Sequence, residues 1–205
     1  MIAWTLPKLL LKLPYRRAIL GASMAIALTA LGICSHRQVS FWNNGITLFS
    51  HAVEVTQNNW LAYNNLGVAY FKLGRHHEAI EVCKQAIRIK ADYAEAHNNL
   101  GAAYDSLGRH QEAVEAYKQA INIKPDYAEA HSNLGIAYDS LGRCRDAIET
   151  FKQAIKLKPD YTDAHLGLGL AYLKVSDKAS ALEEYKILKT LNAELADKFF
   201  NMVNK

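Results

Sequence analysis

The sequence predicts an all-α fold: a right-handed superhelical solenoid of helix-turn-helix repeats, preceded by one transmembrane helix. The first observation is a fixed period, because residues 94–127 and 128–161 are identical at 24 of 34 positions without a gap. The same frame extends to residues 60–93 and 162–195. The second observation is a basic leader and an uncharged apolar run ahead of the repeats. A period of this length is typical of a solenoid, in which each unit buries its apolar face against its neighbours.

Each repeat has the pattern of two short helices. In residues 94–107 the apolar side chains have the i, i+3, i+4, i+7 spacing of one helix face: Leu100, Ala103, Tyr104 and Leu107. Gly108 follows, where a left-handed residue can end a helix, and residues 110–123 repeat the apolar pattern. Pro125 ends the second helix, and we expect Asp126 to cap the next one.

These residues resemble the tetratricopeptide repeat, whose pattern has Leu-Gly at positions 7–8, Tyr at 11, Ala at 20 and 27, an aromatic residue at 24 and Pro at 32. The matching residues of the second repeat are Leu100, Gly101, Tyr104, Ala113, Tyr117, Ala120 and Pro125. Alanine replaces this proline in the outer repeats, at Ala91 and Ala193. Gly101 and Gly135 lack the bulk that would hold two packed helices apart, so we expect both in helix–helix contacts.

The resemblance implies that the first helices line a groove for a protein or an extended peptide, with positions 5 and 6 facing it. These positions hold the candidate peptide-binding residues Asn64, Asn65, Asn98, Asn99, Ser132 and Asn133. A side-chain amide offers a donor and an acceptor together, so a row of amides can pair with an extended backbone. A similar row occurs in the repeats of the O-linked N-acetylglucosamine transferase, but here Leu166 and Gly167 end it. The alternatives are tolerated polar surface, or binding by the charged residues Lys72, Asp105, Asp139 and Lys174.

The residues that could carry catalysis or hold a metal occur once per repeat and are not expected to converge. This applies to His97, His131 and His165, which we interpret as packing residues. No glycine-rich phosphate loop, nucleophile elbow or Cys/His cluster occurs, so we predict no enzyme, no cofactor and no metal site. Residues 60–195 hold 17 Lys/Arg and 18 Asp/Glu, which does not favour a nucleic-acid partner. Cys83 and Cys144 lie about two repeats apart, so we expect no disulfide between them.

The N-terminal part predicts attachment to a membrane. Residues 1–17 form a basic leader, and residues 18–35 are long and apolar enough for a transmembrane helix. Four Lys/Arg precede this run and Arg37 alone follows closely, which predicts a cytoplasmic N-terminus and extracytoplasmic repeats. A signal peptide cleaved near Ala30-Leu31-Gly32 and a buried helix of the globular part remain as alternatives.

Half-units are expected at both ends of the array. In residues 40–59, Phe49 and Ala52 fall at positions 24 and 27 of a preceding repeat, so this segment predicts a second helix that caps the array. Its missing first helix coincides with residues 26–39, inside the apolar run. Residues 196–205 predict a C-terminal capping helix, begun near Ala193, with three apolar side chains for the last repeat: Phe199, Phe200 and Val203.

A second resemblance concerns the junction before the repeats. The stretch Phe-Trp-x4-Thr-Leu-Phe-x-His-Ala at residues 41–52 is similar to the junction of the last membrane helix with the repeats in multi-spanning, glycosyltransferase-like membrane proteins. We therefore predict a non-catalytic, membrane-anchored scaffold that binds proteins through its concave groove. The alternatives are a C-terminal fragment or accessory subunit of a membrane glycosyltransferase system, and a soluble exported adaptor after signal cleavage.

Overall fold

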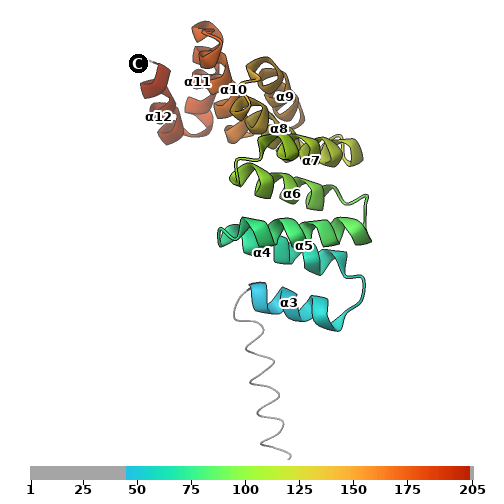
Figure 1. Cartoon of the computed structure of the whole chain (residues 1–205). Helices are drawn as coiled ribbons and strands as arrows, with labels where there is room; N and C mark the ends of the chain where they lie inside the picture. The colour runs from blue at the N-terminus through green and yellow to red at the C-terminus, as the bar shows by residue number, and fades with distance from the viewer. Residues whose placement is uncertain (1–44, 204–205) are drawn as a thin grey trace, which may run out of the picture.

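The computed structural model describes residues 45–203, with side chains described to residue 201, and these residues form ten helices and no strand (Figure 1). The helices are α3 (Gly45–Val55), α4 (Trp60–Lys72), α5 (His76–Ile89), α6 (Ala94–Ser106), α7 (His110–Ile123), α8 (Ala128–Ser140), α9 (Cys144–Leu157), α10 (Thr162–Lys174), α11 (Lys178–Leu191) and α12 (Ala193–Val203). The helices α4, α6, α8 and α10 start at residues 60, 94, 128 and 162, in step with the 34-residue period. The predicted all-α solenoid is confirmed for this part of the chain.

The helices stack in chain order into one elongated array (Figure 1). Each first helix packs on the second helix of its own repeat, and each second helix packs on the next first helix. The first helices also contact one another directly, α4 with α6, α6 with α8 and α8 with α10. The four first helices therefore form one continuous row along the array. We call the surface formed by α4, α6, α8 and α10 the inner face.

Glycine allows the two helices of a repeat to approach closely, as predicted for Gly101 and Gly135. A Cβ atom on Gly101 would lie 2.6 Å from Cε1 of Tyr117, and one on Gly135 would lie 2.8 Å from Cε1 of Phe151. Real Cβ atoms do not approach a ring this closely, so any larger residue would move the helices apart. Tyr117 and Phe151 are almost completely buried, and their burial depends on these glycines.

The turn inside each of the first three repeats uses a left-handed glycine. Gly74, Gly108 and Gly142 have φ angles of 72°, 73° and 73°, as predicted for Gly108. In the fourth repeat Ser176 takes this conformation with φ 63°. The prediction that Asp126 caps the following helix is wrong. The capping position of α8 belongs to Tyr127 and has no side-chain hydrogen bond, because α8 starts two residues after Asp126.

Both ends of the array are closed by single helices. At the N-terminal end α3 packs on α4, and a Cβ atom on Gly45 would lie 3.4 Å from Cβ of Ala69. At the C-terminal end Phe199 of α12 is fully buried, and its ring fills the space over Gly169. In the second repeat the equivalent space is filled by that repeat's own aromatic residue. Phe200 is 40% exposed, and the side chain of Val203 lies outside the described residues.

The predicted membrane segment lies outside the described residues. This applies to the basic leader at 1–17 and to the span at 18–35. Between residues 45 and 203, no helix is long and apolar enough to cross a bilayer. The transmembrane helix therefore stays a prediction from the sequence.

The close contact at Gly101 gives a testable prediction. Replacement by leucine, Gly101→Leu, forces α6 away from α7 because the ring of Tyr117 already occupies the space. Overpacking of this kind costs about 1–3 kcal/mol or more, so the midpoint of chemical denaturation should fall clearly. The control is Ser106→Leu on the same helix, where the side chain is exposed and little change is expected. An unchanged midpoint for Gly101→Leu would place this face outside the helix interface.

Candidate peptide-binding face

Side-chain amides join successive repeats along the inner face. Asn99 Nδ2 donates a hydrogen bond to Asn64 Oδ1 at 2.9 Å, and Asn133 Nδ2 donates to Asn98 Oδ1 at 3.0 Å. The amide of Asn64 also donates to the hydroxyl of Tyr93 at 3.4 Å. Each pair links position 6 of one first helix with position 5 of the preceding first helix. The predicted row of amides is therefore partly used inside the protein.

The six candidate residues fall into two groups by burial. The residues at position 5 are buried between helices, with Asn64, Asn98 and Ser132 exposed by 5%, 8% and 1%. The residues at position 6 are half-buried at the inner face: Asn65, Asn99 and Asn133. Position 5 therefore differs from the expectation, because its side chain points at the next first helix and not at solvent. Peptide binding by these residues stays a prediction, and only position 6 has surface to meet a ligand.

The two paired amides at position 6 keep unused bonding capacity. Asn99 and Asn133 each commit one N–H, which leaves a carbonyl oxygen and a second N–H without an intramolecular partner in the described structure. Asn65 makes no side-chain hydrogen bond with any described residue. The row ends at the fourth repeat because Gly167 has no side chain to reach Ser132.

An apolar strip runs beside the amides on the same helices. Position 9 of the four first helices holds Val68, Ala102, Ile136 and Leu170, one apolar residue per repeat. Three of these side chains are half-buried, and Ile136 is 43% exposed. An exposed apolar side chain next to an open amide suits a chain that offers backbone groups and small apolar side chains.

Tyrosines and carboxylates alternate where the first helices begin. Burial, followed by the nearby carboxylates Glu129 and Glu95, raises the pKa of Tyr127 to about 12. Burial also raises the pKa of Tyr93 and of Tyr161, with smaller contributions from Glu95 for the first and from Asp163 and Glu129 for the second. These hydroxyls are neutral at physiological pH.

The carboxylates at the start of α6, α8 and α10 form an acidic edge: Glu95, Glu129 and Asp163. This edge was not predicted from the sequence. Its signal is the repeated pentapeptide Asp-Tyr-Ala-Glu-Ala at 92–96 and 126–130, which continues as Asp-Tyr-Thr-Asp-Ala at 160–164. Glu129 and Asp163 are exposed, whereas Glu95 lies 3.7 Å from Nζ of Lys124. Lysines lie at the same edge, with Nζ of Lys124 and Lys158 at 4.8 and 5.0 Å from the ring centroids of Tyr127 and Tyr161, so they offset part of its negative charge.

Three of the four charged residues of the alternative interpretation already have a partner inside the protein. Lys174 Nζ donates to Asp139 Oδ2 at 2.6 Å, across the junction of the third and fourth repeats. Asp105 Oδ1 lies 2.6 Å from Nδ1 of His110. A ligand that used these carboxylates would have to displace existing partners.

The recurring histidines tie each first helix to the preceding turn. Nε2 of His97, His131 and His165 lies 2.9–3.0 Å from the carbonyl oxygens of Ala91, Pro125 and Pro159. A carbonyl oxygen only accepts, so each ring donates there. His165 is buried, and its Nδ1 also lies 2.6 Å from Glu184 Oε2. Within residues 45–203, no group of three or more His, Cys, Asp or Glu side chains could hold a metal ion.

The described cysteines are free thiols. Cys83 and Cys144 form no disulfide. Burial raises the pKa of the Cys83 thiol to about 12, because its sulfur packs over Gly67 in the place of the aromatic rings. A thiol in this state is a packing group and not a nucleophile at neutral pH.

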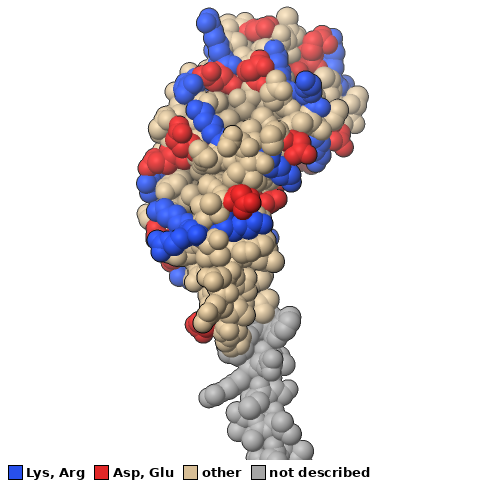
Figure 2. Space-filling view, turned by 90° about the vertical axis from the view of Figure 1, so that its right-hand side faces the viewer, with Lys and Arg blue, Asp and Glu red and all other residues tan. Residues whose placement is uncertain are grey.

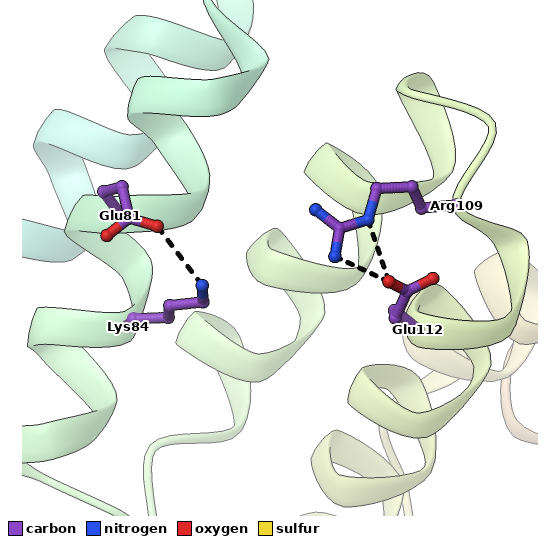
Figure 3. A network of polar contacts seen from close by, with 4 residues as sticks. All are labelled: Glu81, Lys84, Arg109 and Glu112. Carbon is purple, nitrogen blue, oxygen red and sulfur yellow. Dashed lines mark hydrogen bonds and ion pairs between the residues drawn. The ribbon is translucent and has the colours of Figure 1, made fainter.

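The second helices carry self-contained ion pairs on the opposite side of the repeat (Figure 3). Arg109 donates to Glu112 at 2.6 Å and stacks over the ring of Tyr104 at 4.5 Å. On α5 of the preceding repeat, Lys84 Nζ donates to Glu81 Oε1 at 3.2 Å. Exposed pairs of this kind contribute little to stability and leave little net charge for a partner.

Family models match most of the repeat region. A model described as "Tetratricopeptide repeat" matches residues 59–126, and another with the same description matches residues 106–150. A model described as "TPR repeat" matches residues 137–176. Among curated proteins, Protein O-mannosyl-transferase Tmtc3 of Drosophila melanogaster is 35% identical over 71 residues. That match covers 35% of this chain and 8% of the Tmtc3 protein.

Solved structures share the fold over most of the chain. The crystal structure of MamA is 28% identical, has a TM-score of 0.68, and the match covers 80% of this chain and 95% of that one. TTC0263, a thermophilic TPR protein of Thermus thermophilus, is 23% identical, with a TM-score of 0.67 and coverage of 89% and 97%. The first TPR of Spaghetti (RPAP3), bound to the HSP90 peptide SRMEEVD, is 22% identical, with a TM-score of 0.57 and coverage of 60% and 98%. At these identities, the last two show the fold alone.

The amide pairs predict a difference between two equivalent asparagines. Asn99→Ala removes the donor of a half-buried hydrogen bond and leaves Asn64 Oδ1 unpaired, which should cost about 1–3 kcal/mol of unfolding free energy. Asn65→Ala removes no hydrogen bond between described residues and should change stability by less than about 0.5 kcal/mol. Chemical denaturation of the two variants checks this. Equal stability of both would contradict the inter-repeat role of the amide pairs.

Proposed function

We propose that this chain, in which residues 59–176 consist of tetratricopeptide repeats, is a non-catalytic scaffold that holds an extended segment of another protein on its inner face. The observation that carries the proposal is that the side-chain amides of Asn99 and Asn133 each use only one N–H for a hydrogen bond within the described structure. Each amide is fixed in place by its partner in the preceding repeat. Each still offers one donor and one acceptor at the surface.

A fixed amide suits recognition of a peptide backbone. A peptide group has one N–H and one C=O, so it can satisfy the remaining C=O and N–H of an asparagine side chain. Because the asparagine is already held by the fold, little side-chain entropy is lost on binding. The apolar strip at position 9, with Ile136 as its most exposed member, adds contact area for small apolar side chains. Sequence selectivity from such a surface is modest, which suits a scaffold.

The charge of the inner face favours a segment without net negative charge. Glu129 and Asp163 lie exposed at the start of α8 and α10. The RPAP3 repeat domain, which shares the fold, has an acidic peptide bound. An acidic segment would meet like charge on this chain, whereas an uncharged or basic segment would not.

A second candidate function is a role beside a membrane glycosyltransferase. The similarity to an O-mannosyl-transferase, which reaches 8% of that protein, supports it together with the stretch at residues 41–52. In this case the chain is a repeat-bearing fragment or accessory subunit, and transfer chemistry belongs to another membrane-embedded part.

Membrane attachment by residues 18–35 is part of the proposal. The support is the uncharged run itself and the basic leader at residues 1–17. With the N-terminus cytoplasmic, the repeats face the extracytoplasmic side. Cleavage of the run as a signal peptide would give a soluble exported adaptor with the same inner face.

Replacement of Ile136 tests binding at the inner face. Peptides selected from a displayed library by the full-length chain in detergent should bind Ile136→Asp at least tenfold more weakly, since burial of an isoleucine contributes about 1.5–3 kcal/mol. The matched control is Leu157→Asp, because Leu157 is 41% exposed and lies on the second helix α9. Fluorescence anisotropy measures both affinities. Equal affinity of the two variants, with both folded, would exclude the inner face as the binding surface.

Protease accessibility tests the proposed orientation. In intact bacterial spheroplasts that express the chain, added protease should digest the repeats, and the chain should resist extraction by alkaline carbonate. Complete protection, with digestion only after lysis, would refute the extracytoplasmic location. Release of the chain into the medium, starting near residue 33, would support the exported adaptor.

A further inference from the structure

One of the recurring histidines is enclosed together with a carboxylate. The side chains of His165 on α10 and Glu184 on α11 are 4% and 13% exposed, and Nδ1 of the ring lies 2.6 Å from Oε2 of the carboxylate. Nε2 of the same ring lies 2.9 Å from the carbonyl oxygen of Pro159, in the turn between α9 and α10. The ring therefore joins this turn to both helices of the fourth repeat.

These two contacts require a proton between the ring and the carboxylate. The carbonyl oxygen of Pro159 only accepts, so Nε2 carries a hydrogen. A neutral ring with its hydrogen on Nε2 has a lone pair on Nδ1, and this lone pair would face a carboxylate that also only accepts. Two acceptors at 2.6 Å repel each other unless a hydrogen lies between them. One further proton removes this conflict, whether the ring of His165 holds it or the carboxyl group of Glu184.

The equivalent histidines of the second and third repeats lack this requirement because their second helices differ at one position. Position 23 holds Glu184 in the fourth repeat, but Ala116 and Thr150 in the two repeats before it. The hydroxyl of Thr150 donates to a backbone oxygen of its own helix at 2.7 Å. His97 and His131 also contact a carbonyl oxygen through Nε2, and a neutral ring satisfies that contact. Among these three repeats, the need for a second ring proton is therefore specific to the fourth.

Other charged side chains on the elements packed around the pair lie in water. Figure 2 shows acidic side chains beside lysines and arginines over the upper, C-terminal part of the visible face. The exposed groups on these elements are Glu129 of α8, Lys152 and Lys156 of α9, Lys158 and Asp160 of the turn, Asp163 of α10 and Glu183 of α11. The lysines disfavour a positive ring and the carboxylates favour it, but water weakens both effects. The enclosed carboxylate of Glu184 therefore has the largest influence on His165.

We propose that the fourth repeat is a pH-dependent joint of the array: one proton, shared by His165 and Glu184, holds α11 against α10. When this proton leaves, the lone pair of Nδ1 and the carboxylate face each other, and separation of α11 from α10 relieves the repulsion. The effect reaches the C-terminal end of the array, because α12 packs on α11. The amides of the proposed function belong to the second and third repeats, so this inference goes beyond that function.

The direction of the pH dependence follows from the number of protons bound. An unfolded histidine releases its proton at about pH 6.5, and an unfolded glutamate at about pH 4.3. Above about pH 6.5 the folded pair therefore binds one proton more than the unfolded chain, and a state that binds more protons loses stability as the pH rises. For one proton, the opening equilibrium changes by up to about tenfold per pH unit. The contact of α11 with α10 is thus strongest on the acidic side of this value and weakens on the alkaline side.

Hydrogen exchange of the full-length chain in detergent, followed by mass spectrometry, tests the joint. Exchange is measured at about pH 6 and about pH 8.5, and each rate is divided by the rate of the free peptide at the same pH. Protection of α11 should fall at least about tenfold more than protection of α7, whose repeat has Ala116 at position 23. A wild-type α11 whose protection changes with pH no more than that of α7 overturns the proposal.

Three variants separate the proton from the contact. In Glu184→Gln the amide N–H donates to the neutral Nδ1, so α11 should stay protected and its extra pH dependence should disappear. The matched control is Glu183→Gln, since Glu183 is exposed and pairs with Lys186, and it should keep the wild-type dependence. Thr150→Glu places a carboxylate at the same position beside His131 and should confer the dependence on α9. Wild-type dependence in Glu184→Gln, or a folded Thr150→Glu without any dependence in α9, contradicts the shared proton.

Discussion

The structure depends on the contact between a glycine of each first helix and one side chain packed over it. Tyr117 lies over Gly101, Phe151 over Gly135 and Cys83 over Gly67. This contact sets the distance between the two helices of a repeat, and that distance sets how the next repeat stacks. In the last repeat Phe199 of α12 replaces the residue of α11, so the C-terminal helix is part of the core and not an appendage.

The amides of the inner face serve the fold and, in the proposed function, the ligand. Asn99 and Asn133 hold neighbouring first helices together through one N–H and face the surface with the rest of the amide group. A ligand that bonds to both amides would therefore bridge groups whose geometry depends on the stacking of three repeats. Binding and the stability of the array should be coupled, because whatever tilts one repeat also misplaces the donor that meets the ligand.

The period and the composition of one repeat were enough to predict the helix pairs, the left-handed Gly108 and the packing of Gly101. These features depend on residues within one repeat, and their spacing can be read from the sequence. The amide pairs could not be predicted, since Asn64 and Asn99 are 35 residues apart and meet only through the rotation between repeats. For the same reason position 5 was expected at the groove but is buried. The cap expected at Asp126 failed because a one-residue difference in helix start decides which side chain reaches the first turn.

The amide row ends at Ser132 and Gly167, so the last junction of the array has a different chemistry. The junctions before it are joined by neutral, half-buried amides, which mobile ions hardly affect. The junction of the third and fourth repeats instead combines Phe151 packed against Gly167 with the ion pair of Lys174 and Asp139, in which the lysine is half-exposed. Counterions screen an exposed pair within a Debye length of about 8 Å at physiological ionic strength. Ionic strength therefore acts on the ion pair of this last junction and hardly on the amide contacts of the junctions before it.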